Sequence, residues 1–271
     1  ALLAGCSSKD ERLYRRAEAF LAQGQFQVAA EEYARLAAEF PRSELADDAL
    51  YKLGYILAEE LDRPEAALAY YWALADNYPG SSYADDALMR VMAIQRRRLH
   101  DPGAVRNTYA ELCKRFPNHQ GLRARGLLEV GRAFFEAEDY ERASAVAQEM
   151  TVTYPQQSQE LAQADLLRAR CAERLGVDGA EVEKLYEAII ERYPGTYAAA
   201  AAKREIGWRY FEKRAEHEQQ AAAEMKRRSR VIPGVPGFAS QRGEVLQALA
   251  ALRALLAHRG ETRSLETLVG L

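Results

Sequence analysis

The chain has 271 residues, of which 48% are hydrophobic and 28% charged, with a formal net charge of −3 and a pI near 6.0. This balance gives no indication of nucleic-acid binding, which usually leaves a strongly basic domain. Beyond the first few residues, no stretch reaches the roughly twenty consecutive apolar residues of a transmembrane helix, so we expect a body that does not cross the membrane.

Near the start of the given sequence stands Leu3-Ala4-Gly5-Cys6, followed by the polar run Ser7 to Asp10. Because small residues before a cysteine suit a signal-peptidase pocket, the tetrapeptide resembles a bacterial lipobox. We expect residues 1–9 to be the end of a lipoprotein signal peptide, a lipidated Cys6 and a tether; an accidental apolar start is the alternative. The resemblance implies palmitate-type acyl chains on Cys6, and two or more of them anchor stably. Ser7 in place of aspartate implies the outer membrane of a Gram-negative bacterium.

An aromatic–proline dipeptide recurs at regular intervals through the next two hundred residues. An aromatic residue precedes a proline five times, and successive prolines are 38, 38, 38 and 39 residues apart. The pairs are Phe40-Pro41, Tyr78-Pro79, Phe116-Pro117, Tyr154-Pro155 and Tyr193-Pro194. A fixed period of this length is typical of stacked supersecondary units that bury their apolar faces against one another.

Each unit is predicted to be a pair of helices. In the first, residues 11–22 have helical apolar spacing, residues 23–25 break it, and a second helix from Phe26 ends at Phe40-Pro41. Equivalent positions of the second helices hold the same kind of residue. One position holds a tyrosine in four units: Tyr33, Tyr71, Tyr109 and Tyr186. Another holds a small residue in all five: Ala29, Ala67, Val105, Ala143 and Val182. Glycine is costly inside a helix, so Gly54, Gly131 and Gly207 indicate close packing of first helices.

Ala29, Tyr33, Leu36 and Pro41 have the spacing of the tetratricopeptide repeat, and the next unit repeats it. The resemblance covers roughly residues 10–215. It implies an all-α, right-handed α-α superhelix (a solenoid) of about five helix pairs plus C-terminal helices, with first helices lining a concave groove. Residues 216–271 are then a helix extension, a Pro/Gly loop and a C-terminal amphipathic helix.

Segments 40–50 and 78–88, together with the lipobox, resemble the BamD family of outer-membrane barrel-assembly lipoproteins. They are also similar to the tetratricopeptide domain of the CpoB (YbgF) family. The resemblance implies a non-catalytic, lipid-anchored periplasmic scaffold that binds β-barrel precursors or assembly subunits. The alternative is an envelope adaptor for peptidoglycan synthesis, cell division, or a secretion or motility apparatus.

Acidic pairs are the strongest candidates for chemistry. Asp47-Asp48 and Asp85-Asp86 fall in the first turn of predicted helices, after Ser43 and Ser81 as predicted N-caps. Carboxylates there are favoured by the helix dipole, and the alternative is a metal or acid–base site. Four histidines lie far apart with no partner at ligand spacing. We expect no enzyme, cofactor, metal, nucleic acid or small-molecule substrate.

Partner contacts are predicted at five positions. Tyr51, Tyr55 and Tyr83 lie on or near first helices and are candidate anchors, with burial in the core as the alternative. Leu249 and Leu252 belong to the apolar face of a predicted helix over residues 242–258, which either caps the solenoid or docks into a partner's groove.

Two further groups have open interpretations. The basic cluster at residues 96–98 and the one at residues 226–230 indicate solvated helix faces, or contacts with an acidic partner or lipid headgroups. Cys113 and Cys171 lie in different units, so free thiols are expected in place of a disulfide.

Overall fold

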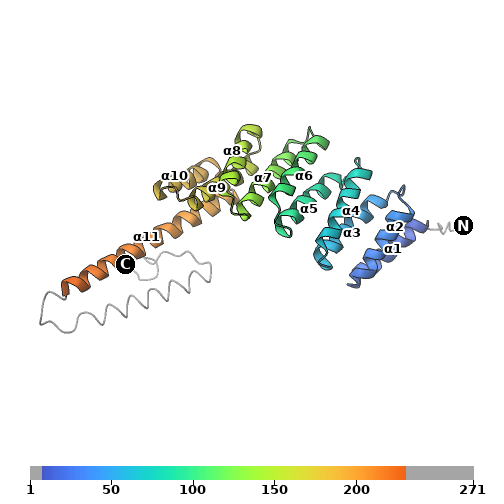
Figure 1. Cartoon of the computed structure of the whole chain (residues 1–271), viewed down its shortest axis with the longest axis horizontal. Helices are drawn as coiled ribbons and strands as arrows, with labels where there is room; N and C mark the ends of the chain where they lie inside the picture. Colours follow the sequence, from blue (N-terminus) through green and yellow to red (C-terminus); the bar gives the residue numbers. More distant parts are fainter. Residues whose placement is uncertain (1–7, 230–271) are drawn as a thin grey trace. The chain divides into compact units, whose positions relative to one another are not determined.

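A computed structural model describes residues 8–229, and this part of the chain is helical, with no strand. Within these residues, the segment up to residue 208 forms one compact unit, and residue 209 begins a second. The helices, coloured along the chain in Figure 1, are α1 (Lys9–Ala22), α2 (Phe26–Glu39), α3 (Ala46–Tyr55) with the π-helix η1 (Ile56–Glu60), α4 (Pro64–Asn77), α5 (Ala84–Arg97), α6 (Pro102–Arg115), α7 (Gln120–Glu136), α8 (Tyr140–Thr153), α9 (Ser158–Arg174), α10 (Gly179–Arg192) and α11 (Tyr197–Ser229).

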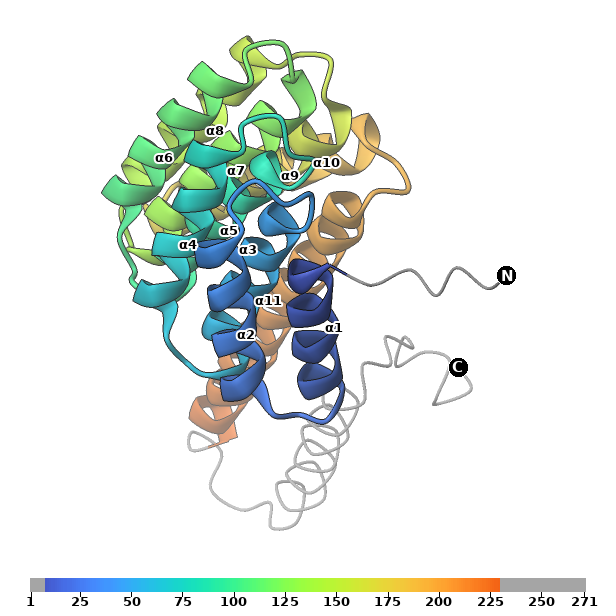
Figure 2. The ribbon, with the colours of Figure 1, turned by 90° about the vertical axis from the view of Figure 1, so that its right-hand side faces the viewer.

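From α1 to α10 the helices form five antiparallel pairs, each packed on the next. Each of these helices contacts its successor along the chain, and among the first helices α7 also contacts both α5 and α9 directly. Figure 2 shows the second helices α4, α6 and α8 along one side, with α3, α5 and α7 beside them. The predicted all-α solenoid of helix pairs is confirmed.

The aromatic–proline pairs end the second helices as predicted. Phe40, Tyr78, Phe116, Tyr154 and Tyr193 are the C-cap residues, and each donates its N–H to the carbonyl four residues earlier. Their backbones share a narrow conformation, with φ between −121° and −130°. The following proline has no N–H and restricts the residue before it to a non-helical conformation, so the helix stops there.

The recurring small and aromatic residues form the core. Ala29, Ala67, Val105, Ala143 and Val182 are fully buried. A Cβ at Gly54 would lie 2.8 Å from the ring of Tyr71, and one at Gly131 would lie 2.8 Å from Leu167. Both glycines are therefore required by packing. Gly207 is not, because a Cβ there would meet no atom within 4 Å.

The turn inside each pair has a recurring left-handed residue. Positive φ occurs at residues 24, 62, 100, 138 and 176, a constant interval of 38. Glycine occupies the first and last of these positions, whereas Asp62, His100 and Glu138 occupy the others. A side chain with a Cβ is strained in this region, so the turn geometry is set by the helix pair and not by glycine alone.

Three of the predicted site residues lie outside the described part of the chain. Cys6, Leu249 and Leu252 lie outside residues 8–229. Within that range, no helix combines the length and apolar character needed to cross a bilayer. Cys113 and Cys171 are both free, as expected, with Cys171 buried.

Candidate functional site

Three tyrosines predicted as partner contacts gather at one place. Tyr51 and Tyr55 lie one turn apart on α3, and Tyr83 immediately precedes α5. The ring of Tyr51 stacks on that of Tyr83, with centroids 5.0 Å apart and an interplanar angle of 26°. Tyr51 also meets buried Tyr71 edge to face at 5.7 Å. We call Tyr51, Tyr55, Tyr83 and Arg90 the tyrosine–arginine patch.

Exposure differs among the three tyrosines. Tyr51 and Tyr83 are half-buried, whereas Tyr55 is 40% exposed and is one of few large apolar side chains to reach solvent in the described residues. The Asp48 carboxylate beside Tyr83 raises the pKa of that phenol. Tyr51 and Tyr83 thus form a fixed aromatic base, and Tyr55 is the ring free to contact a partner.

Arg90, on the exposed side of α5, completes the patch. Its Nε donates to the hydroxyl oxygen of Tyr51 at 3.3 Å, and its guanidinium lies 6.0 Å from the centre of the Tyr55 ring. The hydrogen bond with Tyr51 raises the pKa of Arg90 above its already high value. Arg90 is absent from the predicted contacts, because its role depends on which tyrosines lie across from it.

A π-helix begins at the residue after Tyr55. The segment Ile56–Glu60 leaves the α-helical register of α3, and Ile56 and Leu57 are buried. Short π-helical turns inside helices are uncommon and are frequent at functional sites. This irregularity is independent of the aromatic cluster, and it occurs at the same place.

Next to the patch, a polar network joins the first two pairs. Tyr14 donates to Asp48, and Lys52 donates to the Tyr14 oxygen at 2.6 Å. Lys52 also pairs with Glu18 at 2.7 Å and with Asp48 at 3.5 Å. Tyr33 donates to Glu18. Asp48 is therefore committed to a structural network.

The other predicted roles near the acidic pairs need correction. Ser43 and Ser81 are not N-caps: α3 and α5 begin at Ala46 and Ala84, and their capping residues are Leu45 and Tyr83. Instead, Ser43 donates to Asp10 at 2.5 Å and Ser81 donates to Asp47 at 2.6 Å. These bonds link successive first helices. Among the side chains that the structure describes, no three from His, Cys, Asp or Glu form a group suited to a metal.

The basic cluster at residues 96–98 divides between two environments. Arg96 is buried, with its Nε 2.8 Å from a Glu129 oxygen, and it also pairs with Glu136. Arg98 pairs with Asp62, while Arg97 is exposed. The interpretation as a solvated face is therefore wrong for Arg96, whose charge is used between α5 and α7. The cluster at residues 226–230 lies where no side chain is described.

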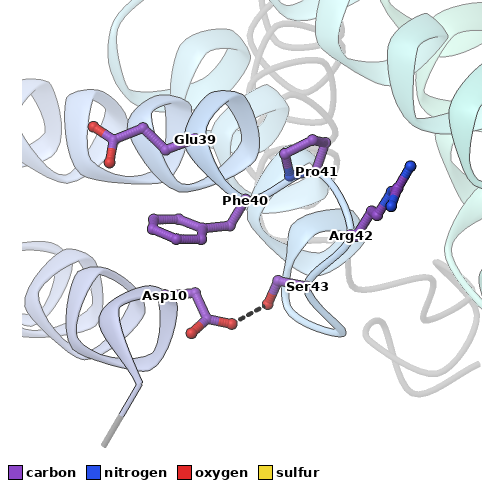
Figure 3. A pocket seen from close by; sticks show the side chains of 6 residues that line it. All are labelled: Asp10, Glu39, Phe40, Pro41, Arg42 and Ser43. Atoms are coloured by element: carbon purple, nitrogen blue, oxygen red, sulfur yellow. Dashed lines mark hydrogen bonds between the residues drawn. The ribbon is translucent and has the colours of Figure 1, made fainter.

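Shallow hollows occur at the turns that join successive pairs. One, of about 320 Å³, is lined by Asp10, Glu39, Phe40, Pro41, Arg42 and Ser43, and the bond from Ser43 to Asp10 closes one side (Figure 3). A second, of about 510 Å³, occupies the equivalent turn at residues 115–120. Hydrogen bonds from Arg35 and Lys9 lower the pKa of Glu39 to about 2, so its charge is already satisfied. These hollows are a by-product of the repeat.

Comparison with known proteins supports the repeat. Residues 14–82 match the sequence model of the tetratricopeptide repeat. No curated protein sequence matches the chain significantly.

Among solved structures, the chain is similar to the crystal structure of MamA protein, with 13% identity and a TM-score of 0.49 over 68% of this chain and 91% of that one. It is also similar to a tetratricopeptide repeat protein from Parabacteroides merdae (16% identity, TM-score 0.36, 89% and 98% covered). The TPR2AB domain of yeast Sti1, in complex with pHSP90, shares 16% identity at a TM-score of 0.31, with 75% and 85% covered.

The sequence match covers the first two helix pairs, and the same unit recurs through α10 with its aromatic C-cap, buried small residue and 38-residue period. Helices α1 to α10 therefore form a stack of tetratricopeptide-like repeats.

Proposed function

We propose that the chain is a non-catalytic scaffold that holds a partner protein against the tyrosine–arginine patch. Tetratricopeptide repeats are protein-interaction modules, and the patch supplies the residue types that dominate binding energies, an exposed tyrosine beside an arginine. The observation that carries the proposal is the exposed Tyr55 ring next to Arg90, on a base of two stacked tyrosines.

The proposal extends to location and process. Cys6 is the lipid-anchored residue, and the scaffold stands at the periplasmic face of an outer membrane as a BamD-like component of β-barrel assembly. The support is the lipobox-like Leu3-Ala4-Gly5-Cys6 together with the segments 40–50 and 78–88. The alternative is the envelope adaptor of peptidoglycan synthesis, cell division, secretion or motility, which shares the same anchor and the same patch.

The test is co-purification from detergent-solubilised membranes of the source bacterium. We expect the wild type to recover a β-barrel protein with periplasmic POTRA domains, and Tyr55→Ala to recover at least fivefold less of it. Val152→Ala is the matched control, since Val152 is 77% exposed on α8, away from the patch. Recovery of Tol–Pal or cell-wall enzymes would favour the adaptor instead.

Anchoring is tested separately. Cys6→Ser should move the protein from the membrane fraction to the soluble periplasmic fraction without changing its helix content. Unchanged membrane retention would exclude lipid attachment at Cys6. The scaffold proposal would then be supported only by the tyrosine–arginine patch.

A further inference from the structure

The repeat register reveals an unbalanced cation in the patch. Arg90 is equivalent to Lys52, which lies 38 residues earlier. Lys52 pairs across the first helices with Glu18 at 2.7 Å. The residue equivalent to Glu18, again 38 residues later, is Ile56, and it is fully buried. The carboxylate that neutralises the cation in one repeat is therefore replaced by a core side chain in the next.

No other side chain takes over this role. Among the side chains that the structure describes, Arg90 forms no ion pair within 4.0 Å of a carboxylate, and its side chain makes one hydrogen bond, from Nε to Tyr51. Glu59 acts on Arg90 only at longer range. In contrast, Arg96, Arg132 and Arg170 all bond to an acid or amide on the next first helix. Arg90 is exposed, so its guanidinium can be reached by a partner.

The chemistry of this arrangement favours one kind of occupant. A guanidinium has a planar fork of donors that suits a carboxylate, and an adjacent aromatic ring shields the pair from water. Tyr55 provides that ring and remains open to an apolar side chain. Tyr55 and Arg90 lie on α3 and α5, successive first helices of the stack, and repeat stacks of this kind bind partners along extended surfaces.

We infer that Arg90 and Tyr55 bind an aspartate or glutamate inside an extended segment of the partner, next to an apolar residue that packs on the Tyr55 ring. This inference rests on the proposed scaffold function and specifies the chemistry of its partner. The occupant is a protein segment, and its acidic residue supplies the carboxylate that the second repeat lacks.

The first experiment needs no known partner. A random twelve-residue peptide library, displayed by messenger RNA so that its C-terminal carboxylate is blocked, is selected on the full chain. We expect enrichment of an internal acidic residue beside an aromatic or aliphatic one. Selection on Arg90→Gln should lose the acidic preference, whereas Arg97→Gln, which changes an exposed arginine of the same helix, should keep it.

The second experiment measures the pairing. The best selected peptide and its version with the acidic residue changed to the amide are compared by fluorescence anisotropy. On the wild type, the amide should bind about tenfold more weakly, a modest value for a close charge pair at an interface. On Arg90→Gln the two peptides should bind equally.

The outcomes separate the two claims. Selected peptides without acidic enrichment, or an acidic preference that survives in Arg90→Gln, would overturn the carboxylate inference and keep the scaffold proposal. Peptides selected equally well by Tyr55→Ala would place binding elsewhere and overturn the inference. A wild-type chain that enriches no peptide would overturn both.

Discussion

Gly54 provides a stringent test of how the patch is supported. A Cβ at this position would come within 2.8 Å of ring carbons of Tyr71, whose side chain is 1% exposed. The ring also contacts Tyr51 edge to face, so it cannot move without disturbing the patch. We predict that Gly54→Ala destabilises the protein, although alanine is normally the better helix former.

Two opposing terms set the magnitude. Replacing glycine by alanine inside a helix gains about 1 kcal/mol. Overpacking a core by one carbon costs about 1–3 kcal/mol. The net expectation is therefore a loss of about 1 kcal/mol. Gly207→Ala is the matched control, because its Cβ would meet no atom within 4 Å, and it should gain up to about 1 kcal/mol.

Urea unfolding followed by circular dichroism measures both variants. Repeat stacks can unfold in parts, so the slopes of the transitions must agree before the midpoints are converted to free energies. Both variants gain the same helix propensity, so the difference between their free energies of unfolding measures the cost of overpacking against Tyr71. If Gly54→Ala were as stabilising as Gly207→Ala, the reasoning that Tyr71 is held against α3 would be refuted.

Three further predictions concern charge and strain. Arg96→Ala should lower the free energy of unfolding in urea by about 3 kcal/mol, because Glu129 loses a buried partner. The control Arg97→Ala, at an exposed residue, should change it by less than about 0.5 kcal/mol. Equal effects of the two variants would contradict the buried pair. Glu138→Gly should raise the free energy of unfolding by about 0.5 kcal/mol. The variant relieves left-handed strain of about 1–2 kcal/mol at φ 61°, which outweighs the larger backbone entropy that glycine loses on folding. A lower free energy of unfolding would contradict this strain. Burial raises the pKa of Tyr193 to about 12 from 10.0, so the folded state holds the proton more tightly and stability should fall as pH rises above 10. Tyrosinate absorbance should then rise together with loss of helix, and independent titration at pH 10 would argue against burial.

The fold was predictable because its signals are local and repeated. Proline after an aromatic residue ends a helix wherever it occurs, so five such pairs at a constant spacing specify five helix pairs. Gly54 and Gly131 were likewise predictable from the cost of glycine in a helix. The same prediction for Gly207 was wrong, because no atom lies within 4 Å of where its Cβ would be.

The candidate site was predictable only in part. Tyr51, Tyr55 and Tyr83 were predicted to lie on or near first helices, but the stacking of Tyr51 on Tyr83 depends on how neighbouring helices approach. Arg90 was missed, although the repeat register could have exposed it by comparing Glu18 with Ile56.

The behaviour of Arg96 shows the same limit. Three consecutive arginines point in three directions on a helix, and only the contact with α7 determines which of them is buried. The capping roles given to Ser43 and Ser81 failed for a similar reason. Their hydroxyls donate to aspartates of the preceding first helix, which are more than thirty residues away in sequence.

Contact between a partner and the tyrosine–arginine patch can be detected by crosslinking. A photoreactive benzoylphenylalanine placed at residue 55, and separately at residue 152 on α8, tests it most directly in living cells of the source bacterium. We expect one discrete crosslinked product at position 55, abolished by Arg90→Gln and absent at position 152. Equal crosslinking at both positions, or none at position 55, would contradict it.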